Sequence, residues 1–131
     1  MNNENQLYRV MQHAIVDVLF DAYGQADSHK LIRAAGFKAG MTFAKSAFDL
    51  SNKLFLFIRH LQKTFKELRI GTLKVEKASA DNVEFTLDCS EHMRYAYATC
   101  CYGEGLLAGI METYIKEKNS GLSSYVIRLS M

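Results

Sequence analysis

The stretch TCCYGEGLLAGIMETYIKEK, from Thr99 to Lys118, decides how this chain folds. It has two adjacent cysteines, three glycines within seven residues, and then an apolar run that ends in charged residues. Gly105 and Gly109 are four residues apart, so they lie on the same face of a helix. Because glycine has no side chain, another backbone can approach that face closely. We therefore predict a helix from Thr99 to about Lys118 that packs tightly against another element.

A second segment has a matching face. Its apolar spacing predicts a helix from His29 to about Phe48, with Asp27-Ser28 as the N-cap. Small residues recur along one side of this helix: Gly36, Gly40, Ala44 and Ala47. Two small-residue faces on two helices are what close contact between a helix and another helix, or a sheet, requires.

The remaining elements follow from hydrophobic periodicity. Apolar residues at helical spacing predict a helix over Leu7 to Phe20, ended by Tyr23-Gly24. Another helix of about 17 residues follows a cap at Asp49-Leu50-Ser51 and is marked by apolar residues from Leu54 to Leu68. After Gly71 the pattern alternates, which predicts a hairpin that turns at Ala80-Asp81-Asn82. Cys89 to Tyr97 is expected to be a loop or short helical turn, and Ser124 to Leu129 a last strand. The order ααα-ββ-α-β predicts one α+β domain over residues 1–131, with helices packed on a small twisted antiparallel sheet.

Composition excludes several classes of protein. The 131 residues are 49% apolar and 23% charged, with no apolar run near the ~20 residues that cross a bilayer. The N-terminus lacks the pattern of a secretory signal, so we expect a cytoplasmic protein without a transmembrane segment. Three cysteines, two of them adjacent, argue against a disulfide scaffold and favour reduced thiols.

Charge gives little support for a nucleic-acid partner. The net charge is +2, and no nucleic-acid-binding motif is present. Seven basic residues between Lys53 and Lys77 form a local concentration of positive charge that could contact phosphate or an anionic membrane surface. We interpret this segment as a solvated helix face and expect no nucleic acid.

Two catalytic or cofactor motifs match only in part. Residues Gly103 to Ala108 fit the dinucleotide pattern G-x-G-x-x-A, but only 26 residues follow Gly105, too few for the rest of a nucleotide-binding unit. A nucleophile elbow at Cys101 would need glycine at the position of Thr99. An enzyme that uses Cys100 or Cys101 with a histidine, or Glu104 as an acid-base group, stays open as an alternative.

A metal site is the third possibility. Cys89 and His92 form a C-x2-H pair, and Cys100 and Cys101 add two thiolates, which is enough in number for tetrahedral zinc. The spacing is not that of a zinc finger or ribbon. The metal candidates are therefore Cys89, His92 and Cys100.

Two segments together resemble the 4-vinyl-reductase or hydrocarbon-binding domain family. LIRAAGFKAGMTFA, from Leu31 to Ala44, is similar to that family's glycine-containing helix, and TCCYGEGLLAGIME, from Thr99 to Glu112, to its later signature. The resemblance implies a fold like the small subunits of the TRAPP vesicle-tethering complex, a homodimer, and an apolar pocket that senses small hydrophobic molecules. The family's zinc ligands include a Glu-x2-Cys, but here Ser120 follows Glu117, so that site is incomplete and we expect no cofactor.

The functional expectation is a non-catalytic domain that binds a small apolar or aromatic molecule and signals through a protein partner. Flexible methionine and flat aromatic side chains suit such ligands. The expected ligand-binding residues are Phe37, Met41, Phe57, Cys101, Tyr102 and Glu104. The alternatives are an assembly subunit of the tethering-complex type and a cysteine-dependent enzyme.

Overall fold

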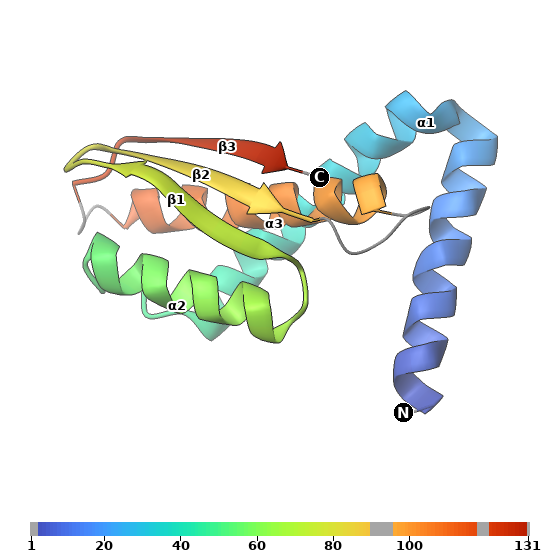
Figure 1. Cartoon of the computed structure of the whole chain (residues 1–131), viewed down its shortest axis with the longest axis horizontal. Helices are drawn as coiled ribbons and strands as arrows, with labels where there is room; N and C mark the ends of the chain where they lie inside the picture. The colour runs from blue at the N-terminus through green and yellow to red at the C-terminus, as the bar shows by residue number, and fades with distance from the viewer. Residues whose placement is uncertain (1–2, 90–95, 118–120, 131) are drawn as a thin grey trace.

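The fold is α+β, as predicted, in a computed structural model that describes residues 3–89, 96–117 and 121–130. The elements are α1 (Asn3–Ala47), α2 (Leu54–Glu67), β1 (Thr72–Ala78), β2 (Asn82–Asp88), α3 (Ala96–Lys116) and β3 (Ser124–Ser130). In these residues, α2 and α3 pack against one side of a three-stranded sheet, and the second half of α1 packs against α3 (Figure 1).

Helix α1 contains both of the first two predicted helices. They join at Gly24, whose φ of 78° and ψ of 168° are not helical, so the chain bends there. The break predicted at Tyr23-Gly24 is confirmed. The N-cap at Asp27-Ser28 is wrong, because the second half of α1 is already helical at these residues. The helix resumes directly after Gly24, so position 28 lies inside it and not at its N-terminus.

The glycine faces of α1 and α3 meet each other directly, which is the helix-to-helix one of the two close contacts that the sequence left open. A Cβ atom at Gly36 or Gly40 would overlap backbone atoms of Tyr102 or Leu106 in α3. Likewise, a Cβ at Gly105 or Gly109 would overlap the carbonyl oxygen of Arg33 or Phe37 in α1. The two helices therefore touch backbone to backbone, and this contact fixes their separation.

The sheet is mixed rather than antiparallel. Strands β1 and β2 form the predicted hairpin, with Leu73 opposite Leu87 and an irregularity between Val75 and Lys77. Strand β3 runs parallel to β2, with Phe85 opposite Ile127. The antiparallel prediction is wrong for β3 because α3 connects the two strands: the helix carries the chain back along the sheet, so β3 starts at the same end as β2.

The core lies between the sheet and the helices. Along β2, the fully buried residues Val83, Phe85 and Leu87 alternate with partly exposed polar ones, so one face of the sheet is covered and the other meets solvent. Helix α2 buries Phe57, Ile58, Leu61 and Phe65 against this face. Its basic residues Arg59, Lys63 and Lys66, and Lys53 directly before it, are all exposed, which agrees with a solvated helix face.

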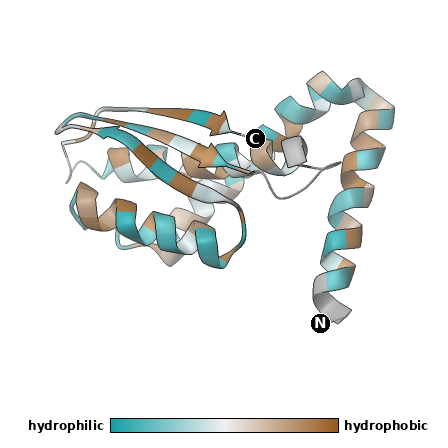
Figure 2. Cartoon of the chain, viewed as in Figure 1, coloured by the Kyte–Doolittle hydropathy of each residue, from teal (hydrophilic) through white to brown (hydrophobic). Residues whose placement is uncertain are grey.

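Figure 2 shows both hydrophobic and hydrophilic residues along each helix, as expected for a helix with one face packed inward and the other exposed to solvent. Across residues 3–89, 96–117 and 121–130, no helix combines the length and the apolar character that a membrane crossing needs.

Candidate functional site

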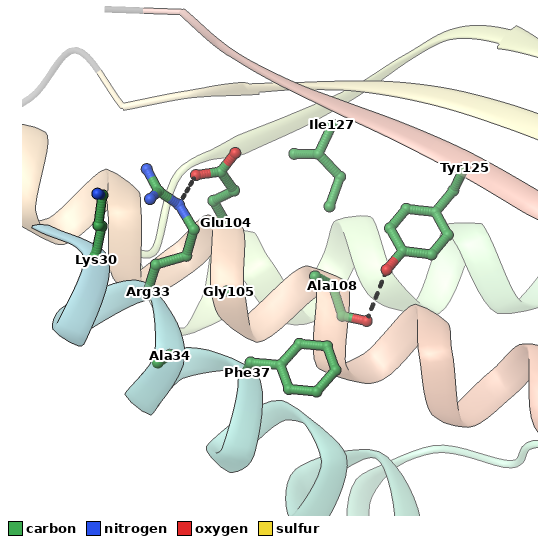
Figure 3. Close-up of a pocket in the computed structure, with 9 residues that line it drawn as sticks. All are labelled: Lys30, Arg33, Ala34, Phe37, Glu104, Gly105, Ala108, Tyr125 and Ile127. Carbon is green, nitrogen blue, oxygen red and sulfur yellow. Dashed lines mark hydrogen bonds and ion pairs between the residues drawn. The ribbon is translucent and has the colours of Figure 1, made fainter.

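A pocket of about 520 Å³ lies where α1, α3 and β3 meet (Figure 3). The glycine contact holds α1 and α3 together, and β3 covers α3 as the last strand of the described sheet. The space between β3 and α1 is left open as a groove. Its lining residues are Lys30, Arg33, Ala34 and Phe37 of α1, Glu104, Gly105 and Ala108 of α3, and Tyr125 and Ile127 of β3.

Periodicity explains why these residues share the pocket. Positions 30, 33, 34 and 37 recur every three or four residues, so they lie along one edge of α1. On β3, Tyr125 and Ile127 are two residues apart and point to the helix side of the sheet, whereas Val126 and Arg128 point away.

One end of the pocket is charged. The Arg33 Nε donates a hydrogen bond to the Glu104 carboxylate at 2.5 Å, which joins α1 to α3 across the pocket wall. The Arg33 Nη2 donates to the sulfur of Cys101 at 3.4 Å, and Cys101 is fully buried. Lys30 lies beside this cluster, so two cations and one carboxylate face the same end (Figure 3).

The environment of Arg33 also affects His29. Partial burial lowers the pKa of the His29 imidazole, and the positive charge of Arg33 lowers it further. His29 therefore favours its neutral form at neutral pH, and Lys30 and Arg33 supply the positive charge here.

The other end of the pocket carries the phenol of Tyr125. Its hydroxyl donates to the Glu112 carboxylate at 2.9 Å, and the Ala108 carbonyl oxygen lies 3.4 Å away. Burial raises the pKa of Tyr125, and the hydrogen bond to Glu112 and the charge of Glu112 raise it further. The phenol is therefore neutral across the physiological range. It contributes an aromatic surface and an anchored hydroxyl.

Between these ends the walls are mainly apolar. The ring of Phe37 and the side chains of Ala108 and Ile127 surround the middle of the space, as Figure 3 shows. A flat or elongated apolar group fits such walls, while a polar group at one end can reach Arg33 or Lys30.

The sequence-predicted ligand residues divide into two groups. Phe37 and Glu104 line the pocket, and Cys101 contacts its Arg33 from the protein interior. Phe57 and Tyr102 lie elsewhere. Phe57 is fully buried and stacks on Tyr114 at 3.8 Å between ring centroids, and Tyr102 lines two other hollows. Met41 is half-buried and does not line this pocket.

The expectation of three reduced thiols is wrong for one pair. Cys89 and Cys100 form a disulfide, with their Cα atoms 5.8 Å apart, and Cys101 is outside this disulfide. Cys89 continues β2, and its N–H donates to the carbonyl of Ser130 at the end of β3. Because α3 begins beneath this end of the sheet, it brings Cys100 against Cys89.

The metal hypothesis has only part of its ligand set within the described residues. The disulfide uses the sulfur atoms of Cys89 and Cys100, and His92 lies outside the described residues. In residues 3–89, 96–117 and 121–130, no three His, Cys, Asp or Glu side chains cluster closely enough to hold a metal ion.

Sequence reasoning missed Lys30, Arg33 and Tyr125. A basic residue on an amphipathic helix resembles any solvated charge, and Tyr125 belongs to a short strand whose neighbours were unknown. One signal was present. Positions 30, 33 and 37 lie on the same helix edge as each other, next to the glycine face that was expected to be buried.

Comparison of the chain with known protein families, with curated proteins and with solved structures found no match. The geometry of the pocket therefore carries the functional argument.

Proposed function

We propose that this chain is a non-catalytic domain that binds a small apolar or aromatic molecule in the pocket between α1, α3 and β3. The observation that carries the proposal is the pocket itself: about 520 Å³, with apolar walls and charged groups at one end. This volume is within the range of about 300–1,000 Å³ that is typical of small-molecule sites. The sequence resemblance to the 4-vinyl-reductase or hydrocarbon-binding family implies the same kind of ligand, and membership of that family is part of this proposal.

The charged end suggests which molecules bind best. Arg33 is held by Glu104, and Lys30 adds a second positive charge to the same rim. An aromatic or aliphatic body that carries one anionic group would place its apolar part against Phe37 and its anion near Lys30. Such a molecule would gain hydrophobic burial and a charge-assisted contact together.

The position of Cys101 favours a binding function over a cysteine-dependent enzyme. The Cys101 side chain is fully buried, with Arg33 between it and the pocket, so a substrate in the pocket does not reach its sulfur. Signalling through a protein partner and a cytoplasmic location are further parts of the proposal. In the cytoplasm, a link such as Cys89–Cys100 would form only transiently.

Two variants of α1 test the proposal with 8-anilinonaphthalene-1-sulfonate, an aromatic anion whose fluorescence rises in apolar sites. Ala34→Leu extends a side chain into the pocket, whereas Ala39→Leu makes the same change toward a different hollow. We expect saturable one-to-one binding to the wild type that Ala34→Leu weakens by about tenfold or more and Ala39→Leu leaves unchanged. Equal binding by both variants, or no saturable binding to the wild type, would refute the proposal.

Native mass spectrometry of the freshly purified wild type provides an independent measurement. A copurified small molecule that is lost from Ala34→Leu but kept by Ala39→Leu would support binding in this pocket. A molecule kept by both variants would show that it binds elsewhere.

A further inference from the structure

Two contacts hold the sheet on α3, one beyond each end of the pocket. At the charged end, the disulfide joins Cys100 of α3 to Cys89, whose backbone N–H donates to the Ser130 carbonyl of β3 at 2.9 Å. At the other end, the Tyr125 hydroxyl at the start of β3 donates to the Glu112 carboxylate at 2.9 Å. The pocket therefore lies between a covalent link and a hydrogen bond.

The lengths of the two elements agree with this arrangement. Tyr125 and Ser130 are five residues apart in an extended strand, which is roughly 17 Å. Glu112 and Cys100 are twelve residues apart in a helix, which is roughly 18 Å. The start of β3 lies at Glu112 and its end lies near the disulfide, so the strand and the helix run in opposite directions. The two contacts are thus as far apart on β3 as they are on α3.

A single row of α3 connects the disulfide to the pocket. The row has a member at every fourth position: Cys100, Glu104, Ala108 and Glu112. Residues at this spacing form one ridge on the surface of a helix. Glu104 and Ala108 line the pocket, and Glu104 holds Arg33. Because Cys100 is one helical turn from Glu104, a movement of α3 at the disulfide first changes the charged end of the pocket.

The disulfide is packed into the interior of the protein. Cys89 is 6% exposed and Cys100 is 0% exposed, and both belong to the hydrophobic core. Protein interiors are close-packed, and two separate thiols need more room than one bonded pair. Breaking the bond therefore loosens the packing between α3 and the end of the sheet. The next residue, Cys101, accepts the hydrogen bond from the Arg33 Nη2, so this change also reaches the cation of the pocket.

The proposed cytoplasmic location makes such a link reversible. Disulfides of cytosolic proteins are usually transient, and they are catalytic or redox-sensing. Cys89, the more exposed member of the pair, is attacked at its sulfur by the thiolate of a small-molecule thiol, and Cys100 leaves as a thiolate. A second small-molecule thiolate then attacks the mixed disulfide and releases Cys89. The two reductant thiols give their protons to Cys89 and Cys100 and become one small-molecule disulfide, and oxidation is the reverse.

We infer that Cys89–Cys100 is a redox modification site that controls the affinity of the pocket between α1, α3 and β3. The inference rests on the proposed function of that pocket. In the oxidised form, the disulfide holds β3 and α3 in the arrangement that binds the ligand, so binding does not have to order them. In the reduced form, binding has to restore this packing, and the affinity falls.

The first experiment compares the two redox forms of the wild type. Treatment with glutathione disulfide or with dithiothreitol prepares them, and alkylation of the denatured protein counts the thiols by mass. We expect one alkylated cysteine in the oxidised form and three in the reduced form. Titration with 8-anilinonaphthalene-1-sulfonate is then expected to show saturable binding that reduction weakens by about fivefold or more and that reoxidation restores. Equal affinity of the two forms, or three alkylated cysteines after oxidation, would overturn the inference.

The titration also separates this inference from the proposed function. Equal saturable binding in both forms would leave the proposed function standing and overturn redox control alone. Absence of saturable binding in both forms would refute the two together. Ala34→Leu, which fills the pocket, is titrated in the same way because dye that binds a loosened protein elsewhere also binds this variant. A difference between redox forms that persists in Ala34→Leu would count against control of the pocket and overturn the inference.

Two cysteine variants identify the responsible thiols. Cys89→Ala cannot form the disulfide, so we expect it to bind as weakly as the reduced wild type and not to respond to the oxidant. The matched control, Cys101→Ala, removes a buried thiol outside the disulfide and is expected to keep the difference between the two forms. Circular dichroism checks the fold of each variant, and the reversible titration of the wild type decides alone where Cys89→Ala does not fold. A folded Cys89→Ala that still responds, or a folded Cys101→Ala that does not, would contradict the assignment of the switch to Cys89–Cys100.

Discussion

Replacing Gly105 by alanine tests the contact on which the fold depends. In an isolated helix this change is favourable by about 0.5–1 kcal/mol, because alanine has the higher helix propensity. In this protein the added Cβ would overlap the Arg33 carbonyl oxygen and lie 2.9 Å from the Phe37 backbone nitrogen. Ordinary contacts of a Cβ begin at 3.4 Å, so α1 and α3 must separate by roughly an ångström or more to relieve the closer contact with the carbonyl oxygen.

The cost of that separation outweighs the gain in propensity. A gap of about 0.5–1 Å forfeits about a quarter to a half of the dispersion energy of each contact across it. Overpacking usually costs about 1–3 kcal/mol when side chains can adjust, and here the obstacle is backbone. We therefore expect Gly105→Ala to lower the free energy of unfolding by about 3 kcal/mol, a large part of the ~5–15 kcal/mol of a typical domain.

Urea unfolding followed by circular dichroism measures this effect, with Gly103→Ala as the control. Gly103 is in the same helix, but its added Cβ would meet the Ile70 and Leu87 side chains, at 2.8 Å and 3.1 Å. Both atoms are side-chain methyl groups rather than backbone, and the half-buried Ile70 can move with its side chain, so we expect a smaller loss than for Gly105→Ala, of about 1 kcal/mol. Equal stability of Gly105→Ala and Gly103→Ala would refute the reasoning about backbone contact.

Two other residues give independent predictions. Ser28 is fully buried, and its hydroxyl oxygen has no hydrogen-bond partner in the described part of the chain, so Ser28→Ala should raise the free energy of unfolding by about 1 kcal/mol. The exposed Ser46→Ala serves as a control, and a clear loss of stability in Ser28→Ala would contradict the prediction. The hydrogen bond from Arg128 lowers the pKa of Glu84 below its ordinary 4.5, with smaller contributions from the charges of Arg128 and Lys77, although desolvation by burial acts in the opposite direction. A carboxyl whose pKa is lowered by folding stabilises the native state above its unfolded pKa and loses that effect as pH falls. The difference in urea midpoint between wild type and Glu84→Gln should therefore be present at neutral pH and shrink below about pH 4.5, and a difference independent of pH would contradict this assignment.

The sequence predicts the helices and their small-residue faces because local signals carry them. The spacing of Gly36 with Gly40 and of Gly105 with Gly109 reports a face without bulk, whatever lies opposite. The hairpin is equally local, since its strands are neighbours in the chain. These parts of the fold need no knowledge of distant contacts.

Long-range geometry accounts for what the sequence does not predict. The direction of β3 depends on how α3 returns the chain, and the alternation of its residues is the same in parallel and antiparallel sheets. The Cys89–Cys100 disulfide depends on where α3 begins relative to β2. In the pocket, Phe37 is expected because aromatic residues suit apolar ligands, whereas Arg33 is recognised only when Glu104 is found opposite.

The glycine contact also has a consequence for synthesis of the chain. Helix α1 ends at Ala47, but α3 ends at Lys116, about 70 residues later. At about 5–20 residues per second, ribosomes take roughly 4–14 s to cover that interval. During this time the glycine face of α1 has no partner, and β2 lacks its neighbour β3. The native packing of this domain is therefore completed only after translation of its C-terminal third, and chaperones that shield apolar surface would act in that interval.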